Sequence, residues 1–236
     1  MVNLEAIRII VGLIGNVISF FLFTSPFTTF LKIIKQKSVG EFKADPYVAT
    51  LLNCAMWSFY GMPFVHPDSV LVVTINGCGF VIELIYIAIF LTYSSNAKRR
   101  RILIALLVEV IFFPVVVFVT LHFLHTTKAR SMIIGILCIV FNIIMYASPL
   151  TIMKMVIKTK SVKYMPFTLS LANFCNGIVW LIYALIKSDP YILLVPNGLG
   201  SISGLVRLIL CATYYQTTNW DEENEIQKSE VQLLDV

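Results

Sequence analysis

Long apolar runs alternate with short polar segments along almost the whole chain. An apolar run of about 18–25 residues can cross the ~30 Å hydrocarbon core of a bilayer as an α-helix. Seven such runs are present, at roughly 6–30, 45–62, 70–93, 102–122, 131–155, 165–186 and 191–215, and the second is short. The pattern therefore predicts an all-α integral membrane protein with seven transmembrane helices and little folded structure outside the bilayer.

Composition supports this prediction. Of the 236 residues, 58% are hydrophobic and only 13% are charged, and the mean hydropathy is +0.85. A soluble domain cannot bury so much apolar surface, so a lipid bilayer is the expected surrounding. The net charge is +5, but the basic residues lie in short clusters between the apolar runs. This distribution disfavours nucleic acid as a partner.

The basic residues also predict how the chain is oriented. The loops after spans one, three and five hold twelve of them: Lys32, Lys35, Lys37, Lys43, Lys98, Arg99, Arg100, Arg101, Lys154, Lys158, Lys160 and Lys163. The opposite side has four: Arg8, Lys128, Arg130 and Lys187. Because cytoplasmic loops are enriched in Lys and Arg, we expect an extracellular N-terminus and a cytoplasmic C-terminus.

One stretch of sequence occurs twice. Residues 37–61 read KSVGEFKADPYVATLLNCAMWSFYG, and residues 160–184 read KSVKYMPFTLSLANFCNGIVWLIYA. An offset of 123 positions relates Asn53, Trp57 and Tyr60 to Asn176, Trp180 and Tyr183, and Ser25-Pro26 to Ser148-Pro149. A repeat of this length in so apolar a chain indicates a duplicated membrane unit.

The repeat extends into the third span of each unit. Asn-Gly-Cys-Gly at 76–79 matches Asn-Gly-Leu-Gly at 197–200, now at an offset of 121. Spans one to three therefore match spans five to seven, and the unpaired fourth span lets both triplets face the membrane in the same way. We expect two parallel three-helix repeats and a linker helix (3+1+3), at 1–95, 129–217 and 96–128, followed by a disordered acidic cytoplasmic tail at 218–236.

Polar side chains at membrane depth suggest a ligand. Among the polar residues within the apolar runs are Asn53, Asn76, Asn142, Asn176 and Asn197. Amides there either hydrogen-bond neighbouring helices or line a wet cavity. Trp57 and Trp180 lie one turn beyond Asn53 and Asn176 on the same helix face. Amides satisfy hydroxyls and indole faces cover C–H groups, which suits a sugar; helix–helix hydrogen bonding and an interfacial aromatic belt are the competing interpretations.

Prolines recur in both halves, on the expected cytoplasmic side: Pro26, Pro46, Pro149 and Pro166. Proline removes a backbone hydrogen bond and bends a helix, so the recurrence favours a hinge or gate over ordinary membrane-helix proline.

Three charges also lie within apolar runs: Glu83, Glu109 and Arg207. Such charges suggest function, although structural or peripheral roles and a buried Glu83–Arg207 pair are alternatives.

Catalytic chemistry has little support in the sequence. His66, His122 and His125 fall at loop or span ends without the spacing of metal ligands. No Ser-His constellation and no phosphate-binding loop is visible. We therefore expect no enzyme activity, no metal and no cofactor.

The chain resembles the plant SWEET sugar transporters over about residues 5–217. The motifs TLLNCAMWSFYG, TINGCG, YASPLTIMK, TKSVKYMPFTLSLANF and PNGLG carry the resemblance, which is greatest to the branch associated with hexoses. It implies a facilitative, bidirectional uniporter of a hexose such as glucose, working by alternating access across the plasma membrane. It also implies association into homo-oligomers.

The resemblance further implies a set of functional residues. The central substrate pocket would be built by Asn76, Asn197, Trp57 and Trp180, with Ser19, Leu22, Asn53, Asn142, Met145 and Asn176. These ten form five repeat pairs, 19/142, 22/145, 53/176, 57/180 and 76/197, which predicts a cavity on a pseudo-twofold axis. The four prolines would form the cytoplasmic gate. Tyr60, Tyr183 and Asp189 would form the extracellular gate, with a Tyr60–Asp189 hydrogen bond as its latch.

Sucrose-moving relatives tend to have a smaller residue where this chain has Met145, so Met145 and Leu22 should favour a monosaccharide. Arg207 stands where the family pattern leads us to expect a neutral residue. A proton-coupled transporter of another solute, of the related proline-glutamine-loop type, is disfavoured by Phe27 and Leu150 after the gate prolines. A seven-span receptor fits the topology but not the repeat, and an intramembrane enzyme is a distant third.

Overall fold

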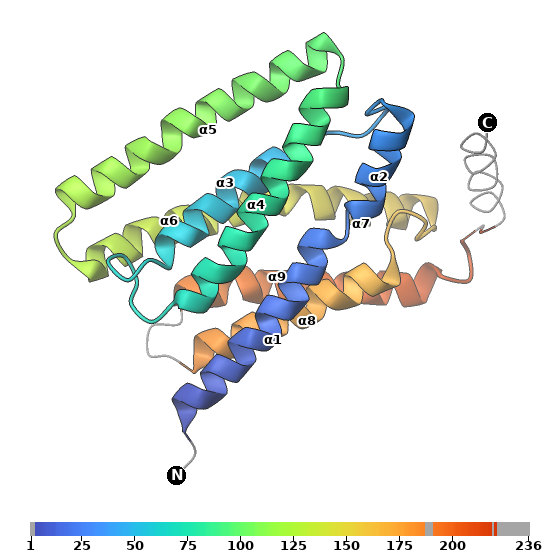
Figure 1. The fold of residues 1–236 in the computed structure, drawn as a ribbon. Helices are drawn as coiled ribbons and strands as arrows, with labels where there is room; N and C mark the ends of the chain where they lie inside the picture. Colours follow the sequence, from blue (N-terminus) through green and yellow to red (C-terminus); the bar gives the residue numbers. More distant parts are fainter. Residues whose placement is uncertain (1–2, 187–190, 219, 221–236) are drawn as a thin grey trace.

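The computed structural model describes residues 3–186, 191–218 and 220, and all regular structure in them is helical (Figure 1). Asp189 falls outside these residues, and so does the expected tail apart from Thr218 and Trp220. The helices are α1 (Leu4–Thr24), α2 (Phe27–Gln36), α3 (Asp45–Tyr60), α4 (Val70–Tyr93), α5 (Asn96–Phe123), α6 (Thr127–Met145), α7 (Ala147–Thr159), α8 (Phe167–Leu185) and α9 (Tyr191–Tyr214).

Seven membrane spans are built from these helices. Within the described residues, six segments are long and apolar enough to cross a bilayer: Leu4–Gln36, Val70–Tyr93, Asn96–Phe123, Thr127–Thr159, Phe167–Leu185 and Ile192–Tyr214. Helix α3 supplies the second span and has only 16 residues, in line with its short apolar run. The outer face of α5 exposes many large apolar side chains, among them Leu107, Val110 and Phe118, as expected for contact with lipid tails.

Spans one and five are each broken into two helices at a proline. Pro26 lies in the break between α1 and α2, and Pro149 lies in the first turn of α7, just after the break at Tyr146. Proline lacks the N–H that would bond to the preceding turn, so a continuous helix is disfavoured there. The two prolines are related by the repeat offset of 123, and the two breaks fall within about one helical turn of equivalent positions.

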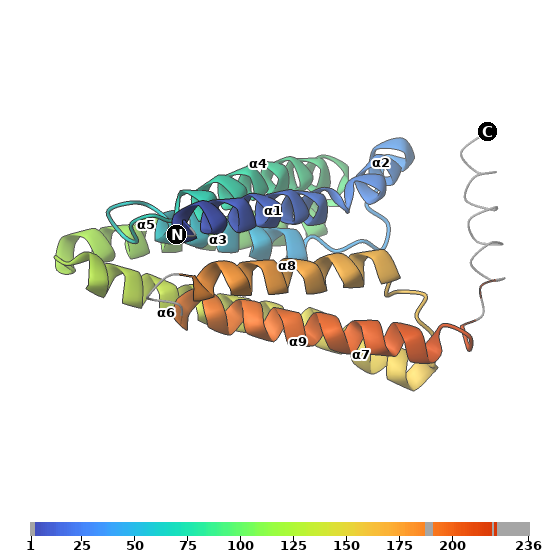
Figure 2. The same cartoon turned by 90° about the horizontal axis from the view of Figure 1, so that it is seen from below.

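The two triplets pack in the same way. Helix α4 contacts both α1 and α3, and α9 contacts both α6 and α8. The triplets meet where α1 packs on α8 and α3 packs on α6, two contacts that a pseudo-twofold axis would exchange. Figure 2 shows α1, α3 and α4 as a layer above α8 and α9. The linker helix α5 packs against α3 and α6 on the outside.

Glycine permits the closest of these approaches. A Cβ atom placed on Gly204 of α9 would lie 2.8 Å from the Cα and 2.9 Å from the N of Phe174 in α8. These are backbone atoms, so the helices themselves would have to separate. Gly77 in α4 has open space where its Cβ would be, with no atom within 4 Å.

We expect Gly204→Ala to destabilise the protein by about 1–3 kcal/mol, because overpacking forces the backbone to shift. Gly77→Ala is the matched control, since both variants gain the same helix propensity from alanine. Thermal unfolding in detergent measures the effect. Equal midpoints for the two variants would show that the α8–α9 approach is not limited by Gly204.

Candidate functional site

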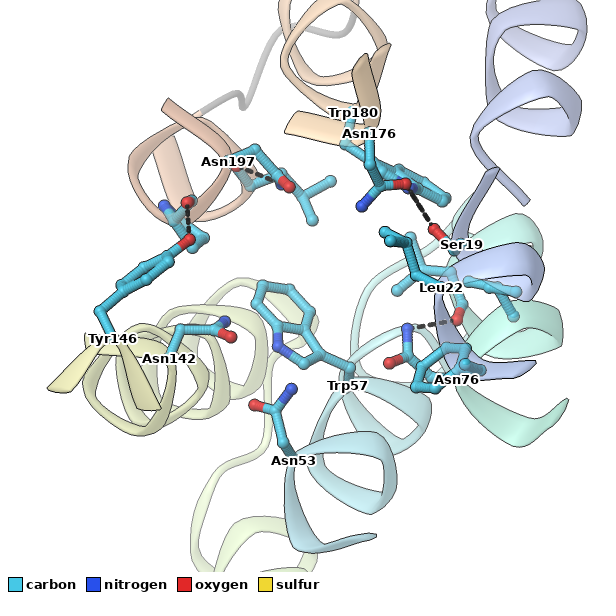
Figure 3. A pocket seen from close by; sticks show the side chains of 15 residues that line it. Ser19, Leu22, Asn53, Trp57, Asn76, Asn142, Tyr146, Asn176, Trp180 and Asn197 are labelled. Carbon is cyan, nitrogen blue, oxygen red and sulfur yellow. Dashed lines mark hydrogen bonds between the residues drawn. The ribbon is translucent and has the colours of Figure 1, made fainter. Parts of the chain in front are cut away.

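A cavity of about 270 Å³ lies between the two triplets (Figure 3). Nine of the ten predicted pocket residues line it: Ser19, Leu22, Asn53, Trp57, Asn76, Asn142, Asn176, Trp180 and Asn197. They come from α1, α3 and α4 of the first triplet and from α6, α8 and α9 of the second. The tenth, Met145, does not line the cavity, whereas its neighbour Tyr146 does.

Sequence reasoning missed six further lining residues. They are Phe23, Tyr146, Val72, Leu193, Ile75 and Pro196. All six form repeat pairs, because Phe23 and Tyr146 are 123 positions apart, and 72/193 and 75/196 are 121 apart. Applying the repeat offset to apolar positions as well as polar ones could therefore have identified these six residues from the sequence.

One wall of the cavity is tied together by side-chain hydrogen bonds. Ser19 Oγ donates to Asn176 Oδ1 at 2.6 Å (Figure 3). Trp180 Nε1 donates to Ser19 Oγ at 3.1 Å. Ser19 is buried, and its two hydrogen bonds link α1 to α8. The indole of Trp180 is held in one orientation, with an exposed fraction of only 6%.

The opposite wall lacks this network. Asn53 and Asn142 flank Trp57 in Figure 3, and no hydrogen bond joins these three side chains to other residues that the structure describes. Asn53 Oδ1 is buried without a hydrogen-bond partner there. The difference follows from the sequence, because Ser19 of one half corresponds to the longer Asn142 of the other. This wall therefore has unused donors and acceptors for the hydroxyls of a ligand.

Asn76 and Asn197 occupy equivalent places on the third span of each triplet. Asn76 Nδ2 donates to Val72 O at 2.9 Å, and Asn197 Nδ2 donates to Leu193 O at 2.8 Å. These bonds fix each amide against its own helix. They leave each amide oxygen without a partner within the described chain, so both oxygens are acceptors for a hydroxyl in the cavity.

Behind the tryptophans, Tyr60 and Tyr183 close one end of the bundle, which we call the tyrosine end. Each packs edge-on against its tryptophan, with ring centroids 5.3 Å (Trp57–Tyr60) and 5.2 Å (Trp180–Tyr183) apart. Both tyrosines are buried. The cavity is therefore sealed from this end by two repeat-related aromatic pairs.

Two caps that the sequence did not reveal hold these tyrosines. His66 stacks on Tyr60 at 4.7 Å, and its Nδ1 lies 2.8 Å from Ser131 Oγ. On the other side, the Arg8 guanidinium lies 4.2 Å from the ring centroid of Tyr183, and Nη1 donates to the backbone oxygen of Asp68 at 2.9 Å. Arg8 and Ser131 are again 123 positions apart. The expected Tyr60–Asp189 latch lies outside the described residues.

The four gate prolines all lie at helix starts or breaks, at the end of the bundle opposite the tyrosines, which we call the proline end. Pro46 is in the first turn of α3 and Pro166 caps α8, while Pro26 and Pro149 mark the breaks in spans one and five. Their role as a gate stays a prediction.

The intramembrane charges do not pair with one another. Glu83 of α4 is buried, and its Oε2 has no hydrogen-bond partner among the described residues. Glu83 and Arg207 form no ion pair with each other, although both are among the described residues. Glu109 Oε2, on the linker helix, is similarly buried without a partner. The alternative of a Glu83–Arg207 pair is therefore not what the structure shows.

Comparison with known proteins gives the family. The sequence model of a family described as "Sugar efflux transporter for intercellular exchange" matches residues 9–98 and 132–219. The bidirectional sugar transporter SWEET5 of Arabidopsis thaliana is 64% identical over 225 residues, covering 95% of this chain and 93% of the relative. The chain belongs to the SWEET family of sugar transporters.

Two further SWEET proteins support this assignment to the family. The bidirectional sugar transporter SWEET4 of Arabidopsis thaliana is 57% identical, over 94% of this chain and 88% of the relative. A solved structure of a eukaryotic SWEET transporter matches with a TM-score of 0.87 and 37% identity, over 90% of this chain and 99% of that one. This match confirms the predicted 3+1+3 fold, and the SWEET family is one of transporters rather than enzymes.

Proposed function

We propose that this SWEET protein is a facilitative uniporter of a hexose, with glucose as the substrate. The cavity between the triplets supports this most directly, since five asparagine amides and two indoles line a volume of about 270 Å³. Amides pair with sugar hydroxyls, and indole faces cover the C–H groups of a pyranose ring. Pockets for drug-sized ligands span roughly 300–1,000 Å³, so this small cavity favours a monosaccharide.

The same site supports alternating access as the mechanism. The cavity is closed at the tyrosine end, and the helix breaks that let the two halves bend lie toward the proline end. In the proposal, the triplets rock about the sugar, so that one end opens as the other closes. The tyrosine end is extracellular, the protein lies in the plasma membrane, and the chains associate as homo-oligomers; these three points stay predictions.

Counterflow in liposomes tests the proposal. When vesicles hold a high concentration of unlabelled glucose, labelled glucose outside should accumulate transiently above its equilibrium level, because a carrier with one alternating site exchanges sugar for sugar. Equilibration without this overshoot would indicate a channel. Absence of any flux, together with a ligand-dependent partner at the C-terminus, would favour a receptor.

We predict that Pro26→Ala slows this counterflow several-fold while glucose binding is kept. Restoring the helical hydrogen bond would stiffen span one, since proline in a helix interior costs about 3 kcal/mol. Pro114, which lies within the linker helix α5 and is exposed to lipid, supplies the matched control. If Pro26→Ala and Pro114→Ala exchanged glucose at the same rate, the hinge would have to lie elsewhere.

A further inference from the structure

A second, smaller cavity adjoins the sugar cavity within the second triplet. It measures about 110 Å³ and is bounded by α8, α9 and the break between α6 and α7. Tyr146, Asn176 and Asn197 line both cavities, so the two share a wall. Arg207 also lines the smaller cavity. We call it the Arg207 cavity.

The guanidinium of Arg207 has no counter-charge within the described chain. Its Nε is buried without a hydrogen-bond partner, and no ion pair to Arg207 is formed by the described residues. Among the described residues that line the Arg207 cavity there is no aspartate or glutamate. Arginine stays protonated in proteins, and a charge at membrane depth is costly unless something pairs with it. The cavity is therefore a positively charged space without its own anion.

The first triplet is built differently at the equivalent position, which corresponds to Tyr86 at the offset of 121. Tyr86 stacks on Phe30 with centroids 3.9 Å apart, and its hydroxyl donates to Phe23 O at 3.1 Å. The positions that correspond in sequence to Phe30 and Tyr86 are Met153 and Arg207, so the second triplet cannot form this pair of stacked rings. Packing of the repeat thus does not require an arginine at this position. Where the first triplet has an aromatic contact, the second triplet has a polar cavity.

The other polar groups of the Arg207 cavity complement an anion that also carries hydroxyls. Asn176 uses its oxygen to accept from Ser19, which leaves its N–H groups as donors. Ser203 adds a hydroxyl. Asn173 Nδ2 donates to Leu169 O at 2.8 Å, so its oxygen is an acceptor. A guanidinium supported by neutral donors is the arrangement that binds carboxylate or phosphate groups.

We propose that the Arg207 cavity is an oxyanion-binding site beside the sugar cavity. Its ligand is a phosphate or carboxylate group, either as a free inorganic ion or as the anionic group of a hexose derivative whose ring lies in the sugar cavity. The site goes beyond the proposed glucose transport, because neutral glucose offers no charge to pair with Arg207.

Thermal unfolding of the full-length protein in detergent tests this site, with inorganic phosphate, glucose and glucose 6-phosphate as probes at constant ionic strength. Phosphate should raise the midpoint of the wild-type protein by a few degrees, because a ligand that binds only the folded state stabilises it. Arg207→Gln should abolish the rise. The control is Arg100→Gln, which removes one exposed positive charge at the start of α5 and should respond like the wild type.

The probes also separate the two sources of the anion. If the ligand is a free ion, phosphate and glucose 6-phosphate should stabilise equally. If it belongs to a hexose derivative, glucose 6-phosphate should act at about tenfold lower concentration. Trp57→Ala, at a position that lines only the sugar cavity, should then remove only that advantage. The readout needs no transport, so it can fail independently of the proposed function.

Two results would overturn the proposal. One is an unchanged midpoint of the wild-type protein with both phosphate and glucose 6-phosphate. The other is the same rise in Arg207→Gln as in the wild type. Ser203→Ala, which keeps the charge and removes one donor, gives a second test: it should weaken the phosphate response and leave glucose binding unchanged, and an undiminished response would also count against the site.

Discussion

Trp180→Ala is expected to lower glucose uptake by at least about tenfold, which corresponds to about 1.4 kcal/mol of lost interaction. The substitution removes an indole wall of the cavity and breaks the bond from Trp180 Nε1 to Ser19 Oγ, which also orients Asn176. Uptake into proteoliposomes, normalised to the amount of folded protein, measures the effect.

The chain offers a matched control for this experiment. Trp220 is its third tryptophan, and it lies beyond the end of α9, packed on Tyr215 with centroids 5.4 Å apart. Trp220→Ala should transport glucose like the wild type. If Trp180→Ala did so too, the cavity between the triplets would not be the transport site.

Leu22→Ala is expected to raise the uptake of sucrose relative to glucose by about tenfold, since one methylene in an apolar pocket changes discrimination by about 1–3 kcal/mol. Leu22 lines the cavity, and alanine there enlarges a space of about 270 Å³. Competition between the two labelled sugars in one vesicle preparation gives the ratio directly.

Met145→Ala is the companion test, because the role of Met145 in selectivity is still a prediction. The structure has Tyr146, and not Met145, at the wall of the cavity. If Met145 sets the size limit, Met145→Ala should admit sucrose as well as Leu22→Ala does. An unchanged ratio in Met145→Ala and a raised ratio in Leu22→Ala would assign the limit to Leu22 alone.

The internal repeat explains why so much of the site could be predicted from sequence. Residues that correspond in the two halves converge on the axis between them, so the pairs 53/176, 57/180 and 76/197 had to meet if the triplets packed symmetrically. The prolines likewise indicated that spans one and five bend near residues 26 and 149, because the missing N–H acts locally on the helix that contains it; the breaks lie at or within one turn of them.

What could not be predicted depends on contacts between distant segments. The Arg8–Tyr183 and His66–Tyr60 caps form only after the chain returns to the tyrosine end. Tyr146, which stands at the helix break next to Met145, lines the cavity in its place, and sequence reasoning did not single out this tyrosine. The hydrogen bonding of the two walls differs because Ser19 is shorter than its repeat partner Asn142. The repeat offset shows which positions correspond, but it does not show this difference in side-chain length.

The most direct test of the proposed function is uptake of labelled glucose by the purified protein in liposomes, with no pH or voltage gradient. Uniport predicts that glucose equilibrates across the membrane under these conditions and that sucrose enters far more slowly. If glucose crossed only after a proton gradient was applied, uniport would be contradicted, and the charged residues Glu83, Glu109 and Arg207 would be the first to test for coupling.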